Sequence, residues 1–177
     1  MIDALDIRDD LVLPELKVVQ HTQFLDERGQ LYSHFTADSE KKILRGAKFN
    51  HQKFAISHQG VLRGIHGDFK SQKLVSCIFG SIYQVVVDCR PWSSSFGVWS
   101  AFELSGNDCL SILIPPGFGN AYFTSSLQSV YSYQLAYDGE YLDAKDQFTY
   151  LWNDGRFNIE WPCKSPILSE RDMNKSK

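Results

Sequence analysis

Short runs of β-branched and aromatic residues, separated by Gly, Asp and Pro, make up most of the chain. The runs at 73–79 and 82–88 flank Gly80-Ser81, which predicts a β-hairpin. Further strands are predicted at 11–19, 31–35, 53–57, 98–104, 111–114, 121–124 and 129–136. Strands that recur about every ten residues are typical of an all-β sandwich or barrel.

Helical patterns are short and few. Residues 38–44 place acids ahead of lysines and predict a helix, and 142–145 predicts one further helical turn. Pro115-Pro116 cannot donate to a strand ladder, so this pair predicts a fixed bend between two strands.

Length and composition narrow the class of protein. The 177 residues, 43% of them hydrophobic, predict a single domain over 1–177 with a polar tail after about residue 172. A net charge of -3 argues against binding to nucleic acid. The four cysteines show no C-x-x-C spacing and are expected to be reduced, with Cys77 and Cys89 in the core. With no signal-peptide pattern and no membrane-length apolar run, a cytoplasmic protein is expected.

The strand-like segment 61–68 and the residues just after it carry the candidate chemistry. Arg63 and His66 lie in this segment, and Lys73 follows a few residues later in the sequence. Simple alternation would send Arg63 and Ile65 to one face and Gly64 and His66 to the other. One base and two fixed cations suit the removal of a proton from carbon beside a developing negative charge. A solvated basic strand face is the alternative that the residues alone leave open.

A series of motifs in order along nearly the whole chain resembles the dTDP-4-dehydrorhamnose 3,5-epimerase family of the cupin superfamily. The matching segments are Asp26-Glu27-Arg28-Gly29, 61–66, Lys73-Leu74-Val75, 87–91, 114–118, the aromatic strand around Tyr133, Trp161-Pro162 and 166–172. The resemblance implies an all-β cupin-type jelly-roll sandwich or barrel with a few short helices. It also implies a cofactor-independent epimerase acting at C3, or at C3 and C5, of a nucleotide-linked 4-keto sugar.

A narrower branch is also similar, the epimerases of GDP-4-keto-heptoses that serve bacterial capsule and lipopolysaccharide synthesis. The residues that suggest it are His66-Gly67-Asp68, Gly119-Asn120, 136–144 and 146–150. Lys53, Ala55, Ser33 and Gln30-Leu31 depart from the dTDP-sugar pattern, which argues against thymidine diphosphate and fits a different base. Together with the resemblance to this branch, this favours a GDP-4-keto-heptose over dTDP-4-keto-6-deoxyglucose.

The resemblance assigns catalytic roles to four residues. His66 would be the base that removes the proton next to the C4 ketone, with Asp172 orienting it. Lys73 would hold the enolate charge. Tyr133 would return a proton to the opposite face. Because Tyr131 and Tyr137 share a face with Tyr133, the choice among them depends on the register of the resemblance.

The same resemblance assigns substrate contacts and an assembly. Arg63 would share the enolate charge or hold the diphosphate, Arg28 would bind phosphate, and Phe24 would pack on the base. His51, Lys53 and Asn120 are further candidate substrate contacts. Since the segment around Arg28 reaches into the neighbouring subunit in this family, a homodimer with a shared active-site cleft is expected.

No metal and no cofactor are predicted, because the five histidines lack the H-x-H spacing of metal-binding cupins and Lys73 can hold the enolate charge. Two other functions stay open. One is a nucleotide-sugar 3,4-ketoisomerase, and the other is a non-catalytic cupin that binds sugar nucleotides.

Overall fold

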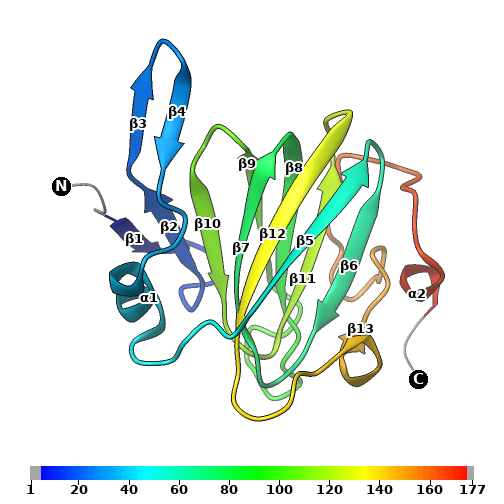
Figure 1. The fold of residues 1–177 in the computed structure, drawn as a ribbon. Coiled ribbons are helices and arrows are strands. Elements are labelled where there is room, and N and C mark those ends of the chain that lie inside the picture. Colours follow the sequence, from blue (N-terminus) through cyan, green and yellow to red (C-terminus); the bar gives the residue numbers. More distant parts are fainter. Residues whose placement is uncertain (1–4, 175–177) are drawn as a thin grey trace.

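The computed structural model describes residues 5–174, and two antiparallel sheets form its body (Figure 1). The six-stranded sheet has the order β1 (Leu5–Asp9), β2 (Lys17–His21), β10 (Leu110–Ile114), β7 (Gln72–Phe79), β12 (Gln128–Ala136) and β5 (His51–His58). The five-stranded sheet has the order β13 (Phe148–Thr149), β6 (Leu62–Gly67), β11 (Phe118–Thr124), β8 (Ser81–Asp88) and β9 (Trp99–Ser105). The predicted all-β sandwich is confirmed.

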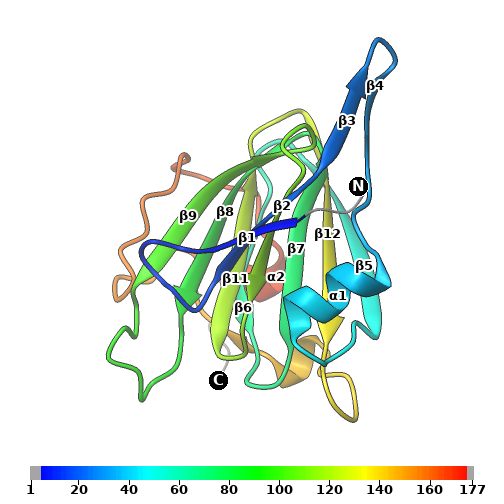
Figure 2. The same ribbon diagram turned by 90° about the vertical axis from the view of Figure 1, so that its left-hand side faces the viewer.

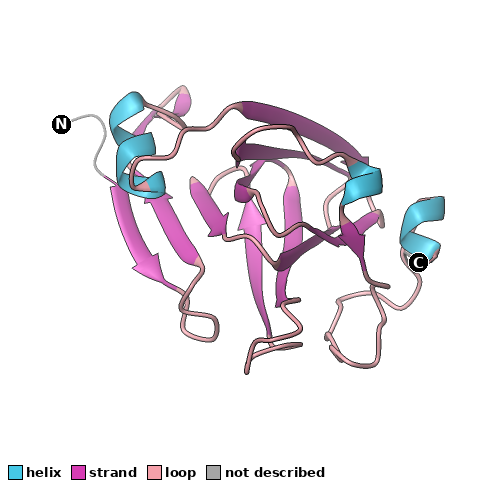
Figure 3. Ribbon diagram, turned by 90° about the horizontal axis from the view of Figure 1, so that it is seen from below, coloured by secondary structure: helices cyan, strands magenta, loops and turns pink. Residues whose placement is uncertain are grey.

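The elements outside these two sheets are short. β3 (Gln23–Asp26) and β4 (Gly29–Tyr32) form a hairpin that projects from the sandwich (Figure 2). The helices are α1 (Ala37–Leu44), the 3-10 turn η1 (Ala144–Asp146) and α2 (Glu170–Met173). Figure 3 shows them at the margins of the strand layers. The predicted bend at Pro115-Pro116 joins β10 to β11.

The hairpin predicted at Gly80-Ser81 is wrong, although both of its strands exist. β7 lies between β10 and β12 in one sheet, whereas β8 lies between β11 and β9 in the other. Both runs are buried on both faces over most of their length, as expected for central strands. Gly80, at a φ of +77°, turns the chain from one sheet to the other, and a Cβ there would meet the Gln128 carbonyl oxygen at 2.1 Å.

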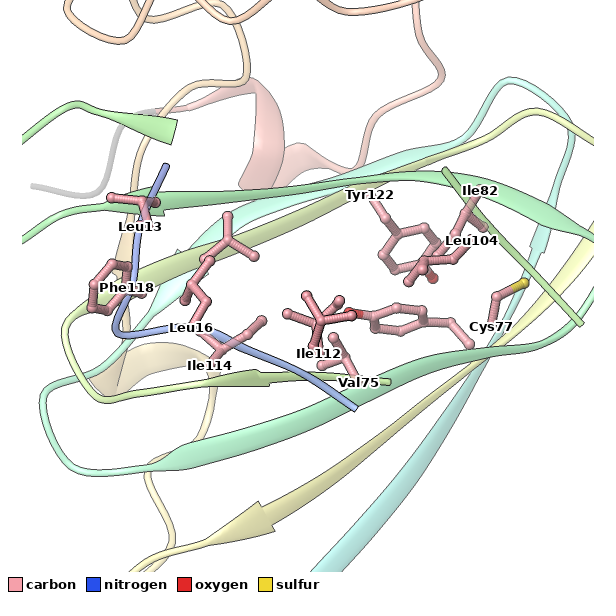
Figure 4. Packing of buried hydrophobic residues seen from close by; sticks show 13 residues of the cluster. Leu13, Leu16, Val75, Cys77, Ile82, Leu104, Ile112, Ile114, Phe118 and Tyr122 are labelled. Carbon is pink, nitrogen blue, oxygen red and sulfur yellow. The ribbon is translucent and has the colours of Figure 1, made fainter. Parts of the chain in front are cut away.

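The main core fills the space between the two sheets (Figure 4). Val75 and Ile112 come from the six-stranded sheet, and Phe118 and Tyr122 come from the five-stranded sheet. Burial of each such side chain stabilises the fold by about 1.5–3 kcal/mol before conformational entropy is subtracted. Cys77 and Cys89 are buried free thiols, as predicted.

Helix α1 covers the outer face of the six-stranded sheet. Ile43 and Leu44 pack with Val19, Leu74 and Leu113. The helix predicted at 38–44 is confirmed and begins one residue earlier. Its cap is Thr36, whose side chain accepts from the Ser39 N–H while the Ser39 hydroxyl accepts from the Thr36 N–H.

The N-terminal part of the chain departs most from the sequence prediction. The strand predicted at 11–19 begins only at Lys17, because the Asp10 carboxylate accepts from the N–H groups of Val12 and Leu13 and forms a turn. The strand Leu5–Asp9 was missed because three of its five residues are charged, which is unusual for a strand, and it is mostly exposed.

Across residues 5–174, no helix has the length and apolar character that a membrane crossing requires.

Candidate active site

A pocket of about 310 Å³ lies where β5, β6, β7, β11 and β12 approach α2 and the loop after β12. Its lining includes six of the residues selected from the sequence as catalytic or as contacts of the reacting sugar: His66, Lys73, Tyr133, Asp172, Arg63 and Asn120. Lys53, selected as a nucleotide contact, lines it as well. A pocket of this volume is large enough for a small ligand.

Arg63 and His66 face this pocket together, so the alternation expected from the sequence is wrong here. β11 pairs with β6 as Tyr122↔Arg63 and Asn120↔His66, which leaves one extra residue in β6 between the two pairs. Such a bulge rotates the strand and returns residues three apart to the same face. It occurs at Gly64, where φ is +116° and a Cβ would meet the Ala121 Cβ at 2.5 Å.

The imidazole of His66 is paired with a buried carboxylate. His66 Nε2 lies 2.6 Å from Asp172 Oδ1, and the Asp172 side chain is only 3% exposed. Burial lowers the pKa of His66, although the contact with Asp172 opposes this effect. A neutral imidazole with Nε2 toward Asp172 leaves Nδ1 to take a proton.

Asp172 is held in place by the short helix that carries it. The Ser169 hydroxyl donates to Asp172 Oδ2 at 2.7 Å, and the Gly64 N–H donates to Oδ1 at 3.4 Å. Burial opposes ionisation of Asp172, yet the contact with His66 and these hydrogen bonds bring its pKa below the usual range. A backbone bridge between Val61 and Ile167 fixes the segment before α2 beside β6.

Lys73 brings a buried ammonium to the pocket. Its Nζ lies 3.4 Å from Asp68 Oδ2, and the two side chains are 9% and 1% exposed. Burial lowers the pKa of Lys73, and the nearby carboxylate of Asp68 acts against that shift. Asp68 is itself fixed by the Lys70 N–H, which donates to Oδ1 at 2.9 Å.

The three candidate tyrosines have different surroundings. Tyr131 is fully buried in the core although it also borders the pocket, and its hydroxyl donates to Gln84 Oε1 at 2.8 Å. Tyr133 follows on the same face of β12 and lines the pocket together with His66. Burial raises the pKa of Tyr133, so its phenol carries a proton at neutral pH. Tyr137 lies beyond the end of β12 and does not line the pocket.

Cationic and aromatic groups surround the open side of the pocket. The Arg63 Nε donates to Ser57 Oγ at 3.0 Å. Lys53 Nζ donates to the Tyr141 hydroxyl at 2.5 Å. His51 does not line the pocket, but its ring lies 4.6 Å from the Tyr141 ring.

Two selected residues lie away from this pocket. Arg28 is at the tip of the β3–β4 hairpin, where its side chain is 86% exposed and pairs with Asp26. Phe24 is on β3 of the same hairpin and is also exposed. Neither residue lines the pocket of its own chain.

Sequence reasoning missed several lining residues, among them Tyr141, Gln147 and Arg171. Arg171 Nε donates to Thr149 Oγ1 at 3.0 Å, and its Nη2 donates to Gln147 Oε1 at 3.4 Å. Its position directly before Asp172 was a usable signal. Tyr141 and Gln147 come from an irregular loop, for which strand periodicity gives no orientation.

Between Leu5 and Asn174, His, Cys, Asp and Glu side chains form no group of three suited to holding a metal ion.

Comparisons with known proteins show which family the chain resembles. The family profile described as dTDP-4-dehydrorhamnose 3,5-epimerase matches residues 10–177. The dTDP-4-dehydrorhamnose 3,5-epimerase of Shigella flexneri is 31% identical over 169 residues, which cover 93% of this chain and 92% of that protein.

Two solved structures show the same likeness in three dimensions. The dTDP-6-deoxy-D-glucose-3,5-epimerase of Legionella pneumophila, in complex with dTDP-4-keto-L-rhamnose, has a TM-score of 0.87 and 30% identity, covering 96% of this chain and 90% of that one. The dTDP-4-dehydrorhamnose 3,5-epimerase of Bacillus anthracis, with TDP and PPi bound, has a TM-score of 0.87 and 27% identity, covering 98% and 99%. The profile match and the identity over nearly the full length show that this chain belongs to the dTDP-4-dehydrorhamnose 3,5-epimerase family, a family of sugar-nucleotide isomerases.

Proposed function

We propose that the chain inverts C3, or both C3 and C5, of a nucleotide-linked 4-keto sugar. The observation that carries this proposal is that a carboxylate-paired imidazole, a protonated phenol and a buried ammonium line one pocket. Inversion needs a base and an acid on different faces of the carbon, and His66 and Tyr133 supply these two groups. Both C3 and C5 flank the same ketone, so one set of groups can serve both positions.

The pKa shifts suit these roles. The lowered pKa of His66 keeps the imidazole neutral and able to accept the proton next to the ketone. Asp172 then stabilises the imidazolium that forms, and the Lys73 ammonium stabilises the enolate oxygen. The raised pKa of Tyr133 keeps its proton available for return to the other face of the carbon. The proton that leaves the sugar is thus accepted by His66, and the proton that returns is donated by Tyr133.

Incubation of the keto sugar in heavy water tests the reaction. The native protein should incorporate deuterium at C3, or at C3 and C5, and the product should show the inverted centre by NMR. His66→Asn, which keeps a polar side chain but removes the base, should abolish uptake. Absence of uptake with every nucleotide sugar offered would refute the epimerase proposal, and a 3-keto product would show a ketoisomerase instead.

The nucleotide is a separate part of the proposal. The relatives' names refer to dTDP-linked sugars, and no comparison supports a GDP-linked heptose. Lys53 and Ala55 line the pocket and depart from the dTDP-sugar pattern, which fits a base other than thymine, and we propose GDP. A thermal-shift screen of dTDP, GDP, UDP and CDP decides between them, because a ligand that binds the folded state raises its melting temperature. A larger shift with dTDP would refute the GDP-heptose preference and leave the reaction class unchanged.

We also propose that two copies complete each other's sites. Arg28 and Phe24 are exposed on a hairpin that extends away from the sandwich, which suits contact with a second copy (Figure 2). Sedimentation should give a dimer, and Arg28→Ala should weaken nucleotide binding while the dimer persists. A monomer that binds nucleotide fully would contradict this arrangement.

A further inference from the structure

Three polar residues form one wall of the pocket: Asn120 and Tyr131 line it, and the fully buried Gln84 lies behind them. Gln84 on β8 is 0% exposed and sits between Tyr131 on β12 and Asn120 on β11. Asn120 is the residue that pairs with His66 across β6 and β11. Buried amides are costly unless each donor and acceptor has a partner, so the hydrogen bonds of this trio determine its orientation.

The backbone fixes which way the Gln84 amide points. Gln84 Nε2 lies 3.0 Å from the Val85 carbonyl oxygen and 3.0 Å from the Ala121 carbonyl oxygen. Carbonyl oxygens only accept hydrogen bonds, so the atom that faces them must be the NH₂ group. The reversed amide would place its oxygen against two other oxygens.

This orientation in turn fixes the Asn120 amide. Gln84 Nε2 donates to Asn120 Oδ1 at 2.7 Å, and the Tyr131 hydroxyl lies 3.1 Å from the same oxygen while donating to Gln84 Oε1. A donor behind Asn120 therefore holds its oxygen toward the core. Both hydrogen bonds that the Asn120 side chain forms within residues 5–174 are on Oδ1, which leaves Nδ2 available on a side chain that lines the pocket.

We infer that Gln84 and Tyr131 are positioning residues that hold the Asn120 NH₂ group toward the substrate, beside His66. The inference rests on the proposed epimerase function. The group that Asn120 Nδ2 would meet is an oxygen that accepts hydrogen bonds, either the ketone oxygen of the sugar or an oxygen on the neighbouring carbon. A ligand group that only donates hydrogen bonds would be rejected at this position.

The donor is also independent of pH. Neither amide titrates, and burial holds the pKa of Tyr131 well above its ordinary value. Asn120 therefore differs from Lys73, whose charge depends on a pKa that burial has lowered. The pocket therefore holds a donor that titrates, Lys73, and a donor that does not, Asn120.

A double-mutant cycle tests whether Tyr131 acts through Asn120. Tyr131→Phe removes only the hydroxyl and should lower kcat about tenfold with little change in KM. In the Asn120→Ala background the same substitution should change kcat less than twofold, because the group that it positions is gone. Asn120→Asp, which keeps the shape but has no NH₂ group, should lose at least as much activity as Tyr131→Phe. Thermal melting of all variants monitors the fold.

The outcomes are distinct. Equal losses from Tyr131→Phe in both backgrounds would mean a purely structural role and would overturn the inference. A native protein that takes up no deuterium would refute the proposed function and with it this inference. Deuterium uptake by the native protein with an additive cycle would refute the positioning role alone.

Discussion

Replacing Asp68 by Asn should impair catalysis through Lys73, a residue that the substitution leaves intact. The Lys73 ammonium is almost completely buried, and Asp68 is its ion-pair partner at 3.4 Å. Asn has nearly the same shape as Asp but no charge. The substitution therefore removes the attraction that opposes the effect of burial on the pKa of Lys73, and that pKa should fall further.

Two costs can be estimated. If Lys73 stays charged, breaking a buried ion pair by removing one partner costs about 3–5 kcal/mol of stability. If Lys73 loses its proton, the enolate loses a preorganised donor worth about 3–4 kcal/mol, which is about 10²–10³ in kcat. Since a buried amine escapes the first cost by losing its proton, we expect the second to dominate at neutral and higher pH.

The assay is the pH dependence of kcat for deuterium exchange at C3. A lysine is charged below its pKa, so activity that needs the ammonium is present at low pH and is lost as the pH rises through that pKa. In Asp68→Asn this loss should begin at a lower pH than in the native protein, and acidification should restore part of the activity. Asp138→Asn, at an exposed position, is the matched control. An Asp68→Asn profile with an unchanged basic limb would refute the reasoning.

The remaining predictions concern the His66 pair, Tyr133 and a buried histidine far from the pocket. Asp172→Asn should lower kcat about 10²–10⁴-fold with a small change in KM, measured as deuterium exchange, because the imidazolium loses its carboxylate; an unchanged kcat would contradict the pairing. Tyr133→Phe should still exchange deuterium through His66 but form about 10²-fold less inverted product by NMR. Burial, with a smaller effect from neighbouring His34, lowers the pKa of His21 to about 4. The unfolded state therefore binds more protons between pH 4 and 6.5, and stability falls as the pH drops through that range. His21 should account for about 3 kcal/mol of the difference between the free energies of unfolding at pH 7 and pH 4, measured by urea denaturation. His21→Gln should remove this contribution, whereas the exposed control His58→Gln should keep it.

The strands could be predicted from the sequence better than their pairing could. The runs around Val75 and Val86 have the composition of buried strands, and both are central strands of the sandwich. The local sequence around Gly80-Ser81 is compatible with a hairpin, in which the two strands pair, and equally with a turn that leads from one sheet to the other. Only the packing of the two sheets decides between these outcomes, and that information is spread over the whole chain.

The site divides in a similar way. Residues on strands or in short recognisable motifs, such as His66, Lys73 and Tyr133, could be selected from the sequence and line one pocket. Tyr141 could not, because a loop has no periodicity from which to infer direction. Gln84 could not be selected either, because it is a single polar residue between Tyr83 and three consecutive valines in a buried strand, and the pattern gives it no role.

One glycine explains why the sequence identified the right residues with the wrong geometry. Regular alternation would separate Arg63 from His66, and a chain that followed it would place only one of them in the pocket. Gly64 adopts a positive φ and lies at the bulge in β6. Any other residue there would place its Cβ only 2.5 Å from the Ala121 Cβ. The Gly64 N–H also donates to Asp172, so the same bend that turns His66 into the pocket helps to hold the carboxylate beside it. The irregular backbone is therefore what assembles the base, its partner and the neighbouring cation on one side of the sheet.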